Sequence, residues 1–171
     1  YLPKARLKEI SFQRGFGQRY AGSWQEFEHE APAFFAREPV SELHIFSGLA
    51  SESERARLFS SPLLRQIHEL ALAGLELKNE GAEQLANCRN LPNLRRLNIA
   101  ANGITSSGFE YLSRSPILQQ VTHLLCWSNS DFAAGLKALA TSPYLRNLLV
   151  LNVANNEMTA EMKPFQTQST S

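Results

Sequence analysis

The chain has 171 residues, enough for one domain but too few for two large cores. Seventeen Lys and Arg residues stand against sixteen Asp and Glu residues, and this balance argues against the strongly basic surface of a nucleic-acid-binding protein. No apolar run approaches the roughly 18 residues of a membrane span, and two cysteines are too few for a disulfide framework. We therefore expect a cytoplasmic protein that binds neither nucleic acid nor membrane.

Residues 1–39 are predicted to form a capping unit of strands and a helix. Residues 10–20 favour one or two strands, and Ser23 is a candidate N-cap for a helix over residues 24–37. Pro32 inside that helix should kink it or split it in two. Such a unit would close one end of the core that follows. The aromatic residues that the helix should bury are Trp24, Phe27, Phe34 and Phe35.

Residues 40–165 repeat at an interval of 27 residues. The interval joins Leu43, Leu70, Leu97, Leu124 and Leu151, and the same interval separates Gly81, Gly108 and Gly135. A fixed period of this size is typical of a solenoid, in which each unit buries its apolar edge against its neighbours. We predict five repeats here, followed by a disordered polar tail over residues 166–171.

Each repeat is predicted to contain a short strand and a helix. In the phrase Leu94-x-x-Leu97-x-Ile99, alternation at period two sends Leu97 and Ile99 inward and their neighbours outward. A helical pattern follows, and Ser107-x-x-Glu110 is a candidate capping box for it. Prolines then end the helices and return the chain to the next strand. These prolines are Pro62, Pro116 and Pro143.

The repeat phrase, extended to Asn102 and Ile104, resembles the leucine-rich-repeat consensus. One strand and one helix in every 27 to 28 residues are similar to the ribonuclease-inhibitor-like subclass. The resemblance implies an α/β fold: a right-handed solenoid, forming a segment of a horseshoe, with a parallel concave sheet and convex helices. It also implies a ladder of inward-pointing asparagines that satisfy the backbone of the adjacent turn. The ladder residues are Asn102, Asn129 and Asn156.

The repeats depart from this pattern at three positions. Gly48 and Leu75 occupy the asparagine column, so we expect no ladder in the first two units. Asp131 replaces an apolar residue of the other repeats, and Phe132 should fill the space. Asp131 is then free to cap the following helix.

The N-terminal part has a resemblance of its own. Residues 12–16 read Phe-Gln-Arg-Gly-Phe, and residues 34–43 read Phe-Phe-Ala-Arg-Glu-Pro-Val-Ser-Glu-Leu. Both stretches are similar to a bacterial family of leucine-rich-repeat proteins that carry a "repeat-companion" segment near the N-terminus. The resemblance implies a bacterial source. The companion segment itself has no match here, so the chain is interpreted as a C-terminal portion or a shortened relative.

Outward strand positions supply the candidate binding surface. Leu125 and Trp127 should stand together on the concave sheet, with the small residues Ala100 and Ala154 beside them. An exposed Trp in a shallow apolar bed with a polar rim has the composition of an interface hot spot; the alternative is that Trp127 merely shields the sheet. The candidate partner-binding residues are His44, Phe46, Arg96, Asn98, His123, Leu125, Trp127, Val150 and Asn152.

No catalytic or metal-binding pattern emerges from the sequence. The outward histidines His44 and His123 lie three repeats apart, which places them too far apart to share a proton or a metal. Cys126 occupies an inward strand position and is interpreted as a small apolar residue. The sequence therefore predicts no enzyme, no cofactor and no metal.

The predicted function is a protein-interaction module that binds a protein partner on the concave sheet. One alternative is an accessory or recognition domain of a larger enzyme or effector. The other is a structural homo-oligomer joined through the C-terminal strand, whose edge no sixth repeat covers. The sequence predicts a monomer or a weak homo-oligomer and does not identify the partner.

Overall fold

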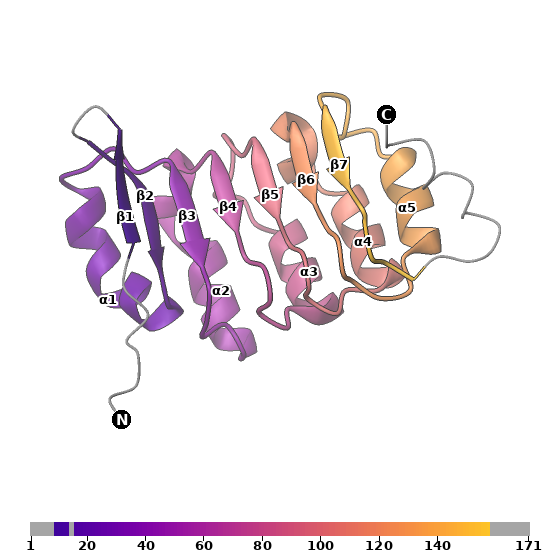
Figure 1. Ribbon diagram of the computed structural model, residues 1–171, viewed down its shortest axis with the longest axis horizontal. Helices are drawn as coiled ribbons and strands as arrows, with labels where there is room; N and C mark the ends of the chain where they lie inside the picture. Colours follow the sequence, from indigo (N-terminus) through magenta and orange to yellow (C-terminus); the bar gives the residue numbers. More distant parts are fainter. Residues whose placement is uncertain (1–8, 14–15, 158–171) are drawn as a thin grey trace.

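The computed structural model describes residues 9–13 and 16–157, which form an α/β fold with one seven-stranded open sheet (Figure 1). The strands cross the sheet in chain order, and only β1 (Glu9–Gln13) and β2 (Phe16–Gly22) pair antiparallel. All later pairs are parallel, which confirms the predicted parallel sheet. The later strands are β3 (Glu42–Ile45), β4 (Glu69–Ala71), β5 (Arg96–Asn98), β6 (His123–Leu125) and β7 (Val150–Asn152).

Five α-helices of this described part follow the strands in a row along one side of the sheet (Figure 1). The 3-10 helices η1 (Pro62–Gln66) and η2 (Pro116–Gln120) begin at two of the predicted return prolines and lead back to the sheet. The predicted tail over residues 166–171 and the end of the fifth repeat lie outside the described residues. The helices are α1 (Trp24–Phe35), α2 (Glu52–Ser60), α3 (Lys78–Ala86), α4 (Ser106–Ser113) and α5 (Ala133–Ala140).

The 27-residue interval appears in the structure as the register of the sheet. Leu43, Leu70, Leu97, Leu124 and Leu151 pair with one another across β3 to β7. The first four are at most 1% exposed, which confirms that these positions point inward. The last, Leu151, is 37% exposed. Leu151 keeps the register of this column but is more exposed, because no strand of the described residues lies beyond β7.

The N-terminal unit continues the same sheet. β2 pairs parallel with β3, and Tyr20 lies opposite Leu43 in the core. Ser23 caps α1 through a capping box with Glu26, as its sequence position predicts. The helix is not split: it continues past Pro32 and ends at Phe35. Of the four aromatic residues expected in the core, Trp24, Phe27 and Phe35 are buried and Phe34 is partly buried.

The predicted capping box at Ser107 and Glu110 is wrong, because α4 begins one residue before Ser107. Asn79 of the preceding helix takes over the capping role. Its Oδ1 accepts hydrogen bonds from the backbone N–H groups of Thr105 and Gly108, at 3.0 and 3.2 Å. A side chain from the neighbouring helix thus satisfies N–H groups that a helix leaves unpaired in its first turn.

Asp131 does not cap α5 either. The N-cap position is Phe132, and Oγ of Ser106, in the preceding helix, accepts a hydrogen bond from the first-turn N–H of Gly135 at 3.1 Å. Asp131 instead adopts a positive φ of 39° in the turn before it. The expected role of Phe132 is confirmed: it is fully buried, and its ring meets that of Phe109 edge-on at 4.5 Å. The local shift therefore places Phe132 in the core and leaves the first turn of α5 to be capped by the preceding helix.

The predicted asparagine ladder is present. The side chain of Asn129 accepts hydrogen bonds from the backbone N–H groups of Asn102 and Ile104 at 3.1 and 3.0 Å. It donates to the carbonyls of Ile99 and Cys126 at 3.2 and 3.0 Å. One unit earlier, the side chain of Asn102 makes four hydrogen bonds of the same kind with the backbone. One unit later, the side chain of Asn156 makes three. Each asparagine therefore ties its own turn to the turn of the preceding unit.

A buried arginine replaces the ladder in the first unit. Arg55 of α2 is 7% exposed, and its Nη1 donates to the carbonyls of Leu49 and Ala50 at 3.1 and 2.9 Å. Its Nε donates to Gln84 of α3 at 2.9 Å. These bonds satisfy turn carbonyls next to Gly48, where the ladder asparagine is missing.

We predict that Asn129→Ala lowers the free energy of unfolding by about 2–4 kcal/mol, because it leaves buried backbone groups without partners. Urea unfolding measures the loss. The matched control is Asn93→Ala, since Asn93 is exposed and donates one hydrogen bond, to the Arg65 carbonyl. Equal losses in the two variants would show that the ladder does not stabilise the turns.

The glycines of the 27-residue interval allow neighbouring helices to approach closely. A Cβ at Gly108 would lie 2.5 Å from Cγ2 of Ile104 and 2.7 Å from Oδ1 of Asn79. A Cβ at Gly135 would lie 2.9 Å from Cβ of Phe109. We predict that Gly108→Ala destabilises the protein by about 1–2 kcal/mol although alanine favours the helix, because overpacking outweighs propensity.

Thermal unfolding followed by circular dichroism tests this prediction. Ser107→Ala, at the exposed neighbouring position of α4, should change stability by less than about 0.5 kcal/mol. A stabilised Gly108→Ala variant would contradict the proposed role of the glycine.

Candidate functional site

The face of the sheet opposite the helices, which we call the open face, carries two rows of outward side chains. These residues alternate with the buried residues of each strand and therefore leave the sheet away from the core. Seven of the nine predicted partner-binding residues lie in these rows, and β2 adds one residue to each row. The first row is Arg19, Glu42, Glu69, Arg96, His123 and Val150; the second is Ala21, His44, Ala71, Asn98, Leu125 and Asn152.

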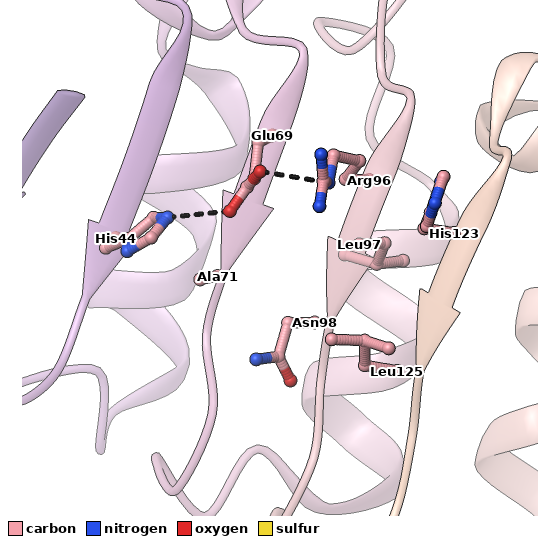
Figure 2. Close-up of a pocket in the computed structure, with 8 residues that line it drawn as sticks. All are labelled: His44, Glu69, Ala71, Arg96, Leu97, Asn98, His123 and Leu125. Carbon is pink, nitrogen blue, oxygen red and sulfur yellow. Dashed lines mark hydrogen bonds and ion pairs between the residues drawn. The ribbon is translucent and has the colours of Figure 1, made fainter. Parts of the chain in front are cut away.

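A pocket of about 190 Å³ opens on this face (Figure 2). Ala71 explains its position, because a single methyl group stands in the second row between the larger His44 and Asn98. Glu69 and Arg96 of the first row complete the pocket lining on one side. Five of the nine predicted partner-binding residues line it: His44, Arg96, Asn98, His123 and Leu125.

Ion pairs join the charged residues of the first row. Nε of Arg19 lies 2.7 Å from Glu42 on the neighbouring strand. Glu69 contacts His44 through Oε1 at 3.0 Å and Arg96 through Oε2 at 3.2 Å (Figure 2). Because an ionised carboxylate only accepts hydrogen bonds, Nε2 of His44 carries the proton in this contact.

The hydrogen bond from His44 lowers the pKa of Glu69 below its ordinary value. The charges of His44, Arg96 and Arg19 act in the same direction, and burial opposes them. Glu69 is therefore ionised at neutral pH. The extension of the Glu69–Arg96 pair through His44 depends on the diagonal approach of two side chains across neighbouring strands.

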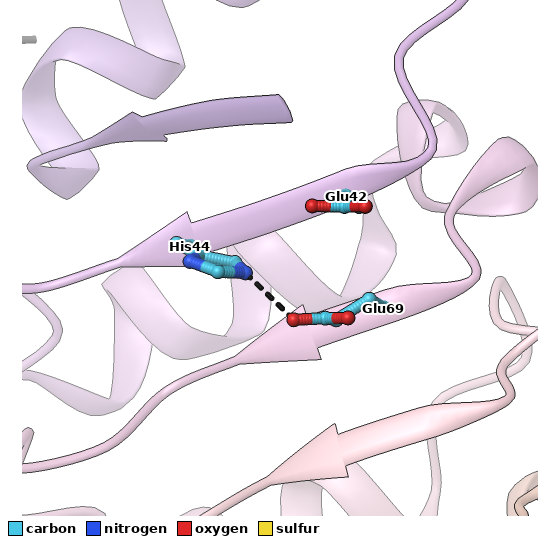
Figure 3. A group of neighbouring side chains, drawn as sticks. All are labelled: Glu42, His44 and Glu69. Carbon is cyan, nitrogen blue, oxygen red and sulfur yellow. Dashed lines mark hydrogen bonds and ion pairs between the residues drawn. The ribbon is translucent and has the colours of Figure 1, made fainter. Parts of the chain in front are cut away.

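Glu42, His44 and Glu69 also form a group of candidate metal ligands, the only one in the described part of the chain (Figure 3). One ligand atom of each lies within 4.8 Å of the others. Arg19 and Arg96 already neutralise the two carboxylates, and their positive charges oppose the entry of a divalent cation. Ion pairing accounts for this grouping, which sequence reasoning missed.

Hydrogen bonds fix the orientation of the two asparagines of the second row. Oδ1 of Asn98 accepts from the backbone N–H of Ala100, and Oδ1 of Asn152 accepts from that of Ala154, both at 3.1 Å. With the oxygens engaged by the backbone, the amide groups Nδ2 are left as donors. Leu125 lies between these two asparagines in the row.

The other four predicted partner-binding residues lie outside the pocket lining. Phe46 and Trp127 follow β3 and β6 and are half-buried, whereas Val150 and Asn152 are exposed on β7. The expected open bed around Trp127 is wrong at Ala100, which is fully buried. The backbone N–H of Ala101 donates to the Trp127 carbonyl, so the two segments lie side by side and leave Ala100 covered.

Three of the eight residues that line the pocket, Glu69, Ala71 and Leu97, were not predicted as binding residues, and neither was Arg19 of the first row. Arg19 could not be placed by the repeat, because it lies 23 rather than 27 residues before its partner Glu42. Ala71 lies in the second row, but a small side chain gives no sequence signal of its own. Its effect depends on the size of its neighbours across the strands.

The remaining reactive residue types are dispersed. β4 and β5 separate His44 from His123, and His29 and His68 are exposed elsewhere. Cys88 and Cys126 are buried free cysteines, and burial raises the pKa of Cys126 to about 12. Cys126 thus behaves as the small buried residue that the sequence predicted, and its thiol stays protonated.

Comparisons with known proteins give no match: no protein-family model matches the chain, and no curated protein is similar enough to count as a relative. Within the described residues, none of the helices combines the length and the apolar character needed to cross a bilayer.

We predict that Glu69→Gln destabilises the protein at pH 6 by up to about 1 kcal/mol and has less effect as the pH falls. A carboxyl whose pKa is lowered by folding contributes stability above its ordinary value, near 4.5, and loses it as the pH falls through the lowered value. Urea unfolding of both proteins at about pH 6 and pH 3.5 measures the difference.

The control for this prediction is the same pair of proteins in a His44→Ala background. There the pH dependence of the difference should shrink, because the largest cause of the shift is gone. A difference that stays constant with pH in the original background would contradict the role of His44.

Proposed function

We propose that the chain is a leucine-rich-repeat protein of the ribonuclease-inhibitor-like subclass, folded as a right-handed solenoid. The in-register leucines of β3 to β7 and the asparagine ladder support this proposal, since each recurs at the 27-residue interval. The bacterial source inferred from residues 12–16 and 34–43 and the cytoplasmic location belong to the same proposal. Two buried, unpaired cysteines are compatible with a reducing compartment.

We further propose that the protein is an interaction module whose open face binds a protein partner. The pocket over Ala71 carries this proposal, because it brings charged, polar and apolar side chains of β3 to β6 to one hollow. At about 190 Å³ it is smaller than the roughly 300–1,000 Å³ of sites for drug-sized ligands. It suits one inserted side chain of a larger partner.

The side chains of the open face are held in fixed positions before a partner binds, and this favours binding. Backbone hydrogen bonds of the sheet hold the rows in place, while Glu69 fixes the side chains of His44 and Arg96 on either side of it. Side chains that are already ordered lose less conformational entropy when a partner docks. The site therefore needs no rearrangement of the strands to bind.

A homo-oligomer through β7 is the second candidate, and the exposure of its apolar residues favours it. Leu149, Val150 and Leu151 are 78%, 41% and 37% exposed. An uncovered edge strand is a template for pairing with another chain. Light scattering over a range of concentrations separates this candidate from the first: a monomer at every concentration removes it.

We expect Trp127→Ala and Leu125→Asp to lose at least about 90% of partner capture while the melting temperature changes by no more than a few degrees. Immobilised protein is exposed to lysate of the source cell, and captured proteins are quantified by mass spectrometry. Tyr111→Ala is the matched control, since Tyr111 is 43% exposed on α4, at the other side of the sheet. Unchanged capture by both open-face variants, or loss in the control, would refute the open face as the docking surface.

A further inference from the structure

We propose that the part of the open face on β5, β6 and β7 recognises an acidic peptide segment that carries a bulky apolar side chain close to its carboxylate. The inference rests on the proposed function and names the chemistry of the partner. Two observations carry it: the distribution of charge along the rows, and the orientation of the hydrogen-bond donors.

In the described rows of β2 to β7, carboxylates occur only on β3 and β4. Glu42 and Glu69 are the carboxylates of the first row, and each is paired with an arginine. The outward residues of β5 to β7 include no carboxylate. In row order they are Arg96 and Asn98, His123 and Leu125, and Val150 and Asn152. The nearest carboxylate, Glu69 on β4, is paired with Arg96, which reduces its repulsion of an anion.

The strands on either side of β6 present hydrogen-bond donors. Arg96 contacts Glu69 through Nε, and its side chain remains 60% exposed, so its Nη groups can reach an external acceptor. On β6, the Thr122 hydroxyl donates to the Arg95 carbonyl and therefore accepts from Nδ1–H of His123, so Nε2 of the neutral His123 ring is an acceptor and adds no donor. Nδ2 of Asn98 and of Asn152 are donors because both side-chain oxygens are engaged by the backbone. Guanidinium and amide donors of this kind favour carboxylates and peptide carbonyls.

Apolar surface lies directly beside these donors. Leu125 lines the pocket next to Asn98, and Val150 is 41% exposed on the next strand. Adjacent strands lie about 4.8 Å apart, so Arg96 and Val150 are roughly 10 Å apart, the span of about three extended residues. A matching segment thus carries Asp or Glu and a Leu-sized or Phe-sized side chain within about three positions of each other.

A nucleic acid fits this surface less well, although phosphates are also acceptors. Arg96 and His123 are the only basic residues in the rows of β5 to β7, and Glu69, on the strand next to β5, already pairs with Arg96. Phosphate-backbone binding relies on many unpaired basic side chains. The net charge of +1 gives no wider attraction.

Selection from a phage-displayed library of random dodecapeptides tests the proposal. The expected pool is enriched in peptides with Asp or Glu within about three positions of Leu, Ile, Phe or Trp. A selected peptide, made synthetically with a fluorescein label, should bind Arg96→Glu at least about tenfold more weakly. The peptide with Asn or Gln in place of its acids should lose about as much affinity for the original protein.

Arg114→Glu is the matched control, because it changes the charge by the same amount as Arg96→Glu. Arg114 follows the last residue of α4, and its side chain is 77% exposed. It should leave peptide affinity within about twofold. Leu125→Ala, which keeps every charge, should weaken the peptide by about fivefold or more through the lost apolar contact.

The outcomes separate this inference from the proposed function. Selected peptides that lose affinity in Leu125→Ala but show no acidic enrichment would overturn the inference and leave an open-face interaction module. Peptides whose affinity changes in neither Leu125→Ala nor Arg96→Glu would count against both the inference and the proposed function. A library that yields no binder would do the same. Tighter binding of a fluorescein-labelled single-stranded 20-mer DNA than of the acidic peptides would overturn the inference in favour of phosphate recognition.

Discussion

In-register parallel pairing of β3 to β7 is the constraint on which the rest of the structure depends. It brings residues 27 positions apart to neighbouring places, so that one buried column of leucines and two outward rows arise from the same register. A shift of one residue would send the leucines to the open face and the charged residues into the core. The asparagine ladder helps to prevent such a shift, because each amide bonds to the backbone of two units at once.

The chemistry of the open face follows from how this register distributes unlike residues. Like charges on β3 and β4 stand side by side, and Arg19 and Arg96 flank them on the adjacent strands. Partly exposed ion pairs of this kind contribute little to stability. Their effect is positional: they hold long side chains at the edge of a hollow that exists because residue 71 is alanine.

The two ends of the described sheet differ in how their apolar residues are covered. At the N-terminal end, α1 and β2 place aromatic side chains over the core, with Tyr20, Phe27 and Phe35 in mutual ring contact. At β7, residues equivalent to buried ones elsewhere are exposed, because each strand depends on the next one for cover. The side chain of Leu151 is therefore only partly buried within the described residues.

The repeat alone determined the strands, the inward leucines and the outward rows of β3 to β7, because period two and the 27-residue interval are properties of local sequence. The ladder was expected from the resemblance to leucine-rich repeats. The starts of α4 and α5 were mispredicted at Ser107 and Asp131, since Asn79 and Ser106 of the preceding helices bond to their first turns. The pocket, the pairing of Arg19 with Glu42 and the burial of Ala100 were decided only by the tertiary structure. Each depends on the relative size and approach of side chains from different strands, which spacing along the chain does not encode.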